Sequence, residues 1–309
     1  MAVYVNTNYS ALQGQRYLGN VQNSLTTTYQ RLSSGMRINS AKDDAAGLQI
    51  ADRLTSQING LNQGNRNASD GIALAQTVES GMDEISGMLQ KIRTLAVQAS
   101  NGTNTAEDKA ALSKEASALA NEITRIANQT TFAGKQILVG QQENTDTIFS
   151  KAAQGQGSKA GTLTLQVGSN KGDTISFKLE NMKFSKISSR ADDKFKLDNT
   201  GVVQIQNKNI TFLFSKADAS LAIAQMDLMI AQVDGSRADL GAIQNRLESS
   251  IRNQSNVAAN EADARSRIRD ADFAEESANL SQQSIIQQAA ASMLMQANTR
   301  PQLGLSLLG

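Results

Sequence analysis

The sequence predicts a mainly α-helical protein: an elongated bundle of long coiled-coil helices that come from both termini, with small β-hairpins in the middle. Three observations predict this fold. Apolar residues recur at coiled-coil spacing near both ends of the chain. A longer stripe with the same steps of three and four follows the first of them. Only the middle of the chain changes to the period of two that strands require.

The first helix is predicted over residues 7–33. Its stripe, in which leucines recur seven residues apart, consists of Ala11, Leu18, Val21, Leu25, Thr28 and Leu32. Gly35 can take the left-handed conformation that often ends a helix, and residues 35–39 then form a linker.

A much longer second helix is predicted over residues 41–100. Ser40 stands three residues before Asp43, which is the spacing of a capping box that would open this helix. The apolar stripe runs from Leu54 to Ala96 and is broken once, by Asn65. A straight helix of this length would reach ~90 Å, which is too long for a compact globule.

A third helix follows after a turn rich in Asn and Gly at residues 101–104. Thr105 and Asp108 make another capping box before it. Its apolar face consists of Leu112, Ala116, Leu119, Ile123 and Ile126. Because the loop is short, we expect this helix to pack antiparallel against the second.

Two β-hairpins are predicted in the middle of the chain. Apolar residues alternate over 163–167 and 175–179, on either side of a polar turn at 168–173, and again over 203–205 and 210–214. The segment 180–201 between them is polar and rich in lysine, so we expect it to be exposed.

The C-terminal third is predicted to be helical again. Asp218 can cap a helix whose stripe runs from Ile223 to Ile251, and the pattern weakens over 253–261. It resumes in a C-terminal arm whose stripe is Phe273, Leu280, Ile286, Ala290, Met293 and Ala297. Around Leu294 this helix is apolar on most sides, so it must be buried on most sides. Pro301 is expected to end it.

The two terminal arms carry opposite charge. Before Lys42 the charged side chains are Arg16, Arg31 and Arg37, whereas residues 270–276 carry four carboxylates. We therefore expect the arms to pair with each other. Two paired helices bury little surface, so these arms need further partners, and the pattern indicates assembly.

Composition argues against an enzyme and against several other classes of protein. Without histidine or cysteine, the chain cannot form a serine–histidine triad, a thiol nucleophile or a zinc–thiolate site. We expect no catalytic residue, cofactor or metal site. No basic stripe with interleaved aromatics predicts nucleic-acid binding, and no apolar run is long enough for membrane insertion. The first residues lack the features of a cleavable signal peptide.

Two charged clusters have more than one interpretation. The pair Asp43 and Asp44 suits the N-terminus of a helix better than a cation site. Arg265, Arg267 and Arg269 stand beside several carboxylates. They can form solvated ion pairs, or they can lie at a contact between subunits.

Several blocks of the sequence resemble one family. At the N-terminal end these are RLSSGMRINSAKDDAAGLQI at 31–50, LQKIRTLAVQASNGTN at 89–104 and TFAGKQIL at 131–138. At the C-terminal end they are SRIRDADF at 266–273, QAN at 296–298 and LSLL at 305–308. In this order, and over about residues 1–180 and 215–309, the chain resembles bacterial flagellin.

The resemblance implies a structural subunit that polymerises into the flagellar filament, the helical propeller used for motility. Residues 1–42 and 262–309 would form terminal coiled-coil arms in an inner tube. Residues 43–182 and 215–261 would form a surrounding layer, a helical bundle with a β-hairpin. Residues 183–214 would form a small exposed outer insert, which makes this a short flagellin with a minimal outer domain. The arms would meet through Leu18, Val21, Leu25, Leu32, Phe273, Leu280, Ile286, Met293 and Leu294.

The resemblance also implies partners and a location. The chain would leave the cell by type III export, secreted without a cleaved signal peptide, and would self-assemble in the extracellular flagellum. Partners would be other copies of itself, a flagellar export chaperone, the filament cap and hook-junction proteins. A Toll-like innate immune receptor or a neighbouring subunit would contact Lys91, Arg93, Leu95, Gln98 and Glu115. Lys91 replaces an arginine common in the family, and lysine is not a planar bidentate donor.

Three alternatives remain beside the filament subunit. A hook–filament junction protein of the same family shares terminal arms of this type but would form a short ring. An intracellular coiled-coil signalling protein would explain the heptads but not the β-hairpins. An enzyme would have to rely on carboxylate or Ser–Lys chemistry.

Overall fold

The computed structural model describes residues 7–140, 147–149, 161–191, 203–206, 209–214 and 219–306. The chain divides into two compact units. One contains residues 1–59 and 257–309, and the other contains residues 60–256. Each unit is described by itself.

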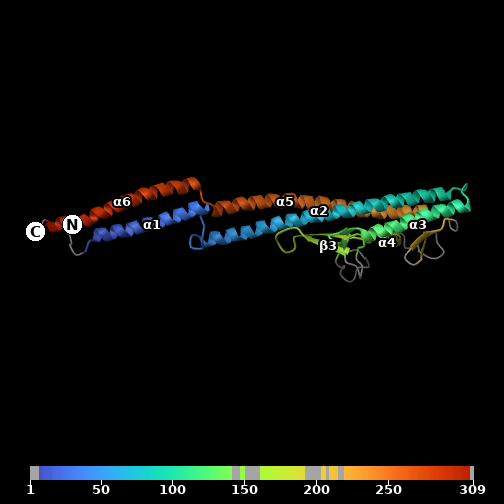
Figure 1. Cartoon of the computed structure of the whole chain (residues 1–309), viewed down its shortest axis with the longest axis horizontal. Coiled ribbons are helices and arrows are strands. Elements are labelled where there is room, and N and C mark those ends of the chain that lie inside the picture. The colour runs from blue at the N-terminus through green and yellow to red at the C-terminus, as the bar shows by residue number, and fades with distance from the viewer. Residues whose placement is uncertain are drawn as a thin grey trace. The chain divides into compact units, whose positions relative to one another are not determined.

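The described residues are mainly helical (Figure 1). The helices are α1 (Tyr9–Ser34), α2 (Ala45–Ser100), α3 (Ala106–Gln129), α4 (Phe184–Ala191), α5 (Ala219–Arg269) and α6 (Phe273–Ser306). The strands are β1 (Thr131–Phe132), β2 (Lys135–Gln136), β3 (Gly161–Gln166), β4 (Thr174–Leu179), β5 (Val203–Gln206) and β6 (Asn209–Phe212). Long terminal helices that pack together and small two-stranded sheets in the middle confirm the predicted fold class.

The unit of residues 60–256 is organised around the predicted stripe of α2. Met82, Ile85, Leu89 and Ile92 on α2 are fully buried, and Leu247 on α5 belongs to the same core. Side-chain contacts between α2 and α5 join Glu79 to Gln244, Asp83 to Arg237 and Arg93 to Asp227. Because the numbers rise on α2 as they fall on α5, the two helices are antiparallel.

The hairpin β3–β4 lies against α2 where that helix has glycines. The two strands pair antiparallel, with Leu163 opposite Phe177. A Cβ on Gly64 would lie 2.0 Å from the Val167 carbonyl oxygen, so this backbone contact is possible only without a side chain. Asn67 holds the same end of the hairpin, because its Nδ2 donates to the Gln166 oxygen at 2.9 Å.

The hairpin β5–β6 is attached to α3 by a row of polar side chains. Asn121 Oδ1 accepts from the Ile210 amide at 3.0 Å, and Asn121 Nδ2 donates to the Ile210 oxygen at 3.1 Å. Ser117 and Ser113 accept from the amides of Phe212 and Phe214 at 2.8 and 3.0 Å. The three side chains are four residues apart on α3 and so lie on one face. They satisfy backbone groups that an edge strand would otherwise leave unpaired.

The segment between the hairpins differs from the expected exposed stretch. Its described part contains α4, whose Phe184, Ile187 and Ser188 are buried. The Phe184 ring packs against Phe212 in a T-shaped arrangement with centroids 5.9 Å apart. The lysines of this segment predicted exposure, but its apolar residues form one face of a short amphipathic helix, and that face is buried in the bundle.

Several predicted boundaries also differ. Asp43 does not open α2: its carboxylate accepts from the backbone amides of Asn39 and Ser40, which closes a turn. The helix begins at Ala45, and Asp44 Oδ1 accepts from the Gly47 amide at 2.9 Å, so Asp44 supplies the cap. The capping box of Thr105 and Asp108 is confirmed. The predicted cap Asp218 lies outside the described residues.

At the C-terminal end, helix α6 continues to Ser306, so the prediction that Pro301 ends it is wrong. A proline has no amide hydrogen and cannot donate to the preceding turn, but the carbonyl groups around it can still accept. The helix therefore passes the proline instead of stopping there.

Candidate assembly interface

Helices α1 and α6 form an antiparallel pair within the first unit, where they lie side by side (Figure 1). Asn8 Nδ2 donates to the Ala297 oxygen at 2.9 Å near one end of the pair. Arg31 and Glu276 are in contact near the other end. The contact therefore follows almost the whole of α1, and the expected pairing of the terminal arms is present.

The seam between the two helices contains part of the predicted apolar set. Val21 and Leu25 are buried on α1, and Ala290 is buried on α6. Five other predicted seam residues are half-buried, namely Leu18, Leu32, Leu280, Ile286 and Leu294. Near Gly14 the helices approach closely, since a Cβ there would lie 3.0 Å from Leu294 Cδ1.

Two predicted seam residues lie outside this contact in the single chain. Phe273 is 69% exposed and Met293 is 71% exposed. Met293 borders a groove of about 640 Å³ that opens between α1 and α6 and is also lined by Tyr17 and Ile286. The apolar character of α6 therefore extends well beyond the side that α1 covers.

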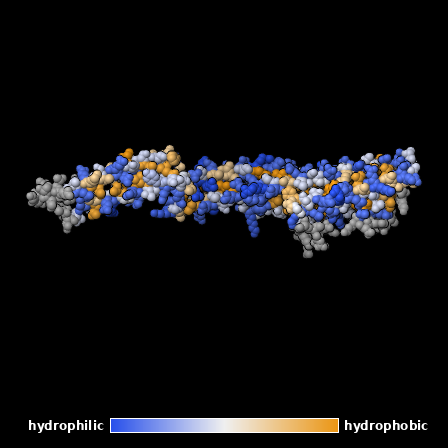
Figure 2. All heavy atoms as spheres, in the orientation of Figure 1, coloured by the Kyte–Doolittle hydropathy of each residue, from blue (hydrophilic) through white to orange (hydrophobic). Residues whose placement is uncertain are grey.

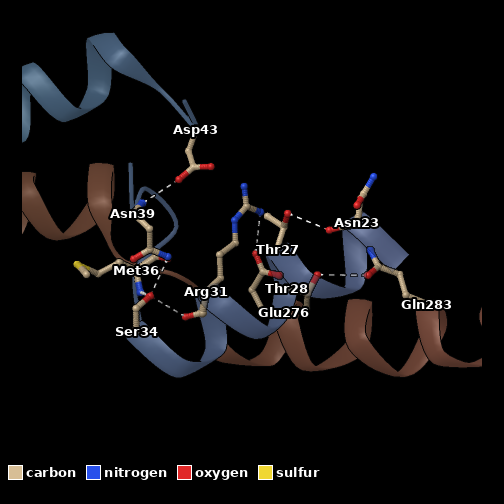
Figure 3. Close-up of polar contacts among 10 residues, drawn as sticks. All are labelled: Asn23, Thr27, Thr28, Arg31, Ser34, Met36, Asn39, Asp43, Glu276 and Gln283. Carbon is tan, nitrogen blue, oxygen red and sulfur yellow. Dashed lines mark hydrogen bonds and ion pairs between the residues drawn. The ribbon is translucent and has the colours of Figure 1, made fainter. Parts of the chain in front are cut away.

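Polar contacts fix the register of the pair (Figure 3). The Arg31 guanidinium donates to Glu276 Oε1 at 3.0 Å, and the Glu276 side chain is only 9% exposed. One turn along, the Thr28 hydroxyl donates to Gln283 Oε1 at 3.4 Å. The charge pattern predicted attraction between the arms but did not identify these partners. Thr28 belongs to the predicted apolar stripe, and its hydroxyl adds a second polar contact to the register that Arg31 and Glu276 fix.

The linkers that precede α2 and α6 are bonded to each other. The Arg37 amide donates to the Arg269 oxygen at 2.7 Å, and the Ala271 amide donates to the Gly35 oxygen at 3.0 Å. Met36 and Asp270 form an isolated antiparallel bridge between these two bonds. Gly35 has a φ of +68°, so it ends α1 in the left-handed conformation that the sequence predicted. The segment that follows α1 and the segment that follows α5 are therefore held together by backbone hydrogen bonds.

Electrostatics support the turn before α2. Backbone hydrogen bonds from Ser40 and Asn39 hold the pKa of Asp43 below its ordinary value, and the Ser40 hydroxyl and the charge of Arg31 act in the same direction. The carboxylate is fully ionised at neutral pH and keeps the linker folded back on itself. Figure 3 shows this Asp43–Asn39 contact beside the Arg31–Glu276 pair.

The arginines near the end of α5 differ in their contacts within the single chain, and a contact between subunits stays a prediction. Arg267 forms an exposed i,i+4 ion pair with Asp263, which is the solvated arrangement. Arg269 instead contributes its backbone oxygen to the linker contact with Arg37, and its side chain is half-buried.

The residues predicted to meet an immune receptor or a subunit lie on α2 and α3. Lys91 Nζ is 3.6 Å from Glu115 Oε1, and both side chains are exposed, as is Gln98. Leu95 is buried in the core of its unit. Arg93 holds Asp227 on α5, and that hydrogen bond, followed by the charge of the carboxylate, raises the pKa of Arg93. Arg93 therefore joins two helices as well as facing solvent.

Among the described residues, no three His, Cys, Asp or Glu side chains come together in a way that could hold a metal ion. None of the helices in the described part of the chain is long and apolar enough to cross a membrane.

Comparison with known proteins points to one family. Residues 5–143 match the bacterial flagellin N-terminal helical region, and residues 223–308 match the bacterial flagellin C-terminal helical region. The chain is 37% identical to Flagellin A of Vibrio cholerae and 34% identical to polar flagellin F of Vibrio parahaemolyticus, and each alignment covers all of both proteins. A putative flagellar hook-associated protein from Vibrio parahaemolyticus has a similar fold. Its TM-score is 0.54 at 16% identity, over 74% of this chain and all of that one.

Proposed function

The chain belongs to the bacterial flagellin family and is a flagellar filament subunit, and on this premise we propose that the α1–α6 pair is where neighbouring copies join. Family membership confirms the predicted structural role in motility and the prediction that the chain is not an enzyme. It also implies polymerisation of the chain with itself in the flagellum.

The proposal rests on the large apolar side chains that remain exposed to solvent on the paired arms. Among the described residues, the large hydrophobic side chains exposed on α1 and α6 are Tyr9, Leu12, Tyr17, Tyr29, Phe273, Ile285, Met293 and Met295. Figure 2 shows hydrophobic residues on the viewer's side of both helices. Large apolar side chains exposed in this number on two paired helices are typical of an interaction site. Side chains on several sides of the pair need several neighbours, and an interface that does not close on itself produces an open helical polymer.

The predicted division of the chain is part of this proposal. Residues 1–42 and 262–309 would line the inner tube, and residues 43–182 and 215–261 would form the layer around it. Both arms belong to one compact unit, which supports their acting together. Residues 183–214, expected as a small exposed outer insert, differ from the rest of this division, because the described part of this segment is buried in the core of its unit through Phe184, Ile187 and Phe212. The alignment with Flagellin A of Vibrio cholerae spans 385 positions although this chain has 309 residues, so that relative contains segments that are absent here.

We also propose a route and partners for the subunit. It would be secreted without a cleaved signal peptide, and an export chaperone would cover the apolar side of α6 around Met293 and Leu294 until assembly. The lack of cysteine suits such a route, because no disulfide has to form or break during transit. The filament cap and the hook-junction proteins would receive the same arms at the two ends of the filament.

Contact with a Toll-like receptor would use the exposed Lys91, Gln98 and Glu115 together with Arg93. The ion pair between Lys91 and Glu115 lies on the surface, so its loss would cost the fold little. Arg93 differs because it also bonds to Asp227 on α5. In the filament the same side chains would pack against a neighbouring subunit.

Deletion of residues 280–309 tests the role of the arms. We expect a soluble chain whose remaining helical unit is folded but which forms no filaments, as seen by electron microscopy. The point variant Leu25→Asp should have the same effect on assembly while the unfolding free energy of the unit of residues 60–256 changes by less than about 1 kcal/mol, since Leu25 belongs to the other compact unit. Filaments formed by either variant would contradict the proposal. A large loss of stability in Leu25→Asp would mean that the arm belongs to the core of the single subunit.

A further inference from the structure

The chain contains the dipeptide Asn-Gly twice, in two different backbone settings. Asn59–Gly60 lies inside α2, whereas Asn101–Gly102 lies in the turn between α2 and α3. Both asparagine side chains are exposed to solvent. A difference in their chemistry must therefore come from the backbone around each glycine.

In the turn, the asparagine side chain lies over the peptide group that follows it. The Asn104 amide donates to the Asn101 oxygen at 3.3 Å, which closes a β-turn with Gly102 at its second position. Asn101 Oδ1 accepts from the Thr103 amide at 3.4 Å, as in an Asx-turn. The Asn101 side chain is thereby folded toward the backbone of its own turn.

The second feature of the turn is the Gly102 amide, which no hydrogen bond engages over the described part of the chain. A Cβ placed on Gly102 would meet nothing within 4 Å beyond its chain neighbours, so no distant segment packs against this glycine.

The helical copy has the opposite features. The Gly60 amide is engaged in the hydrogen-bond ladder of α2, which fixes its direction away from the Asn59 side chain. A Cβ on Gly60 would lie 2.7 Å from Ser169 Cβ, so the hairpin β3–β4 covers this position. The Asn59 side chain is as exposed as that of Asn101, but its neighbouring nitrogen is not available.

We propose that Asn101 is a site of spontaneous deamidation and that Asn59 is protected from it. The Gly102 nitrogen attacks the side-chain carbonyl carbon of Asn101, Cγ, and forms a new C–N bond. The bond from that carbon to Nδ2 breaks, and Nδ2 leaves as ammonia with the proton that Gly102 gives up. Water then opens the succinimide ring at either carbonyl and leaves aspartate or isoaspartate. The net reaction consumes one water and releases one ammonia.

The product changes the end of α2. A new carboxylate lies at the C-terminal end of the helix, where the unpaired carbonyl groups already make the potential negative. The turn is anchored to Gln98, whose oxygen accepts from the Asn101 amide at 3.1 Å and from Asn104 Nδ2 at 2.6 Å. Isoaspartate adds one carbon to the main chain between these anchors. The exposed surface around Gln98 therefore changes with the age of the protein.

The test is incubation of the purified full chain in warm, mildly alkaline buffer, followed by digestion at acidic pH and peptide mass spectrometry. Enzymatic methylation of isoaspartate gives a second readout. We expect the peptide with Asn101 to convert to a mixture of aspartate and isoaspartate while the peptide with Asn59 stays unchanged. Equal conversion of the two peptides, or none at Asn101, would overturn the proposal.

Two further samples separate backbone geometry from local sequence. Gly102→Ala should slow conversion at Asn101 by about tenfold or more. It should leave the fold intact, because Gly102 has open space and no left-handed φ. In concentrated guanidinium chloride, both asparagines should react at similar rates, because unfolding frees the Gly60 amide. An Asn59 that stays inert in the unfolded chain, or a Gly102→Ala variant that reacts as fast as wild type, would refute the backbone explanation.

Discussion

Replacing Gly64 with alanine tests how the hairpin β3–β4 is seated on α2. The new Cβ would lie 2.0 Å from the Val167 oxygen and 2.7 Å from its carbonyl carbon. Both are backbone atoms, so the clash cannot be relieved by rotation of a side chain, and the hairpin has to move. Overpacking of this kind typically costs about 1–3 kcal/mol. Alanine also has a higher helix propensity than glycine by about 1 kcal/mol, so we expect Gly64→Ala to lower the unfolding free energy of the unit of residues 60–256 by a net amount of up to about 2 kcal/mol.

The same helix offers matched controls. Gly87 has nothing within 4 Å of its Cβ position, so Gly87→Ala should raise the unfolding free energy by about 1 kcal/mol through helix propensity alone. Gly71 is intermediate, because its Cβ would meet Leu165 Cδ1 at 2.4 Å, the far end of a flexible side chain. The expected order of stability is Gly87→Ala, then Gly71→Ala, then Gly64→Ala. Because the gain in helix propensity is common to both variants, the two extremes should differ by the cost of overpacking, about 1–3 kcal/mol.

Guanidinium denaturation of the three variants, followed by helical circular dichroism, measures this order. A change in the midpoint at constant slope reports stability rather than a change in the denatured state. If Gly64→Ala were as stabilising as Gly87→Ala, the hairpin could not lie against α2 at this residue, and the reasoning from backbone contact would fail.

Three other perturbations have expected outcomes. Asn121→Ala should lower the unfolding free energy by about 1–3 kcal/mol, because it leaves the amide and the carbonyl of Ile210 in β6 without a partner. Amide hydrogen exchange in β6 should become faster, and an unchanged exchange rate would exclude the contact. Glu276→Gln should raise the critical concentration for assembly by about tenfold, about 1.4 kcal/mol, because the ion pair with Arg31 becomes a hydrogen bond from the guanidinium to a neutral amide oxygen. Sedimentation at several concentrations would measure this change, and an unchanged value would remove the pair from the assembly argument. The hydrogen bonds from Thr105 lower the pKa of Asp108 in the folded chain, so their stabilisation is present above the unfolded-state value and is lost as pH falls through the folded-state value. The difference in unfolding free energy between wild type and Thr105→Ala should therefore shrink in acid, and a difference independent of pH would contradict this assignment.

Much of the fold could be predicted from periodicity. The stripe on α2, the capping box before α3 and both longer hairpins are local patterns, and a local pattern is readable without knowing its neighbour. The pairing of α1 with α6 was predictable because the charges of the two arms are opposite and the apolar residues of α6 exceed what one helix side can hide. The family resemblance followed from blocks of sequence in the same order.

Other features depended on partners far away in the chain. Ser113, Ser117 and Asn121 look like ordinary solvent-facing polar residues of α3, yet they hold a strand about ninety residues later. The lysines around α4 predicted an exposed segment, but the Phe184 ring packs against Phe212, a residue on a later strand. Asn65 interrupts the apolar stripe of α2, and the structure shows its partner: Asn65 Nδ2 donates a hydrogen bond to the Ser255 hydroxyl on α5. None of these partners has a local signature.

Local patterns in the chain specified most of the helices and strands, though not α4 or the course of α6 past Pro301, and they showed that the arms are too apolar to remain alone. Long-range packing set the register of the α1–α6 pair at Arg31 and Glu276, the position of the hairpin on Gly64 and the free amide at Gly102. The physical reason is range: periodicity and capping act within a few residues, whereas the partner of a buried carboxylate or the space beside a glycine is set by chain segments far apart in sequence.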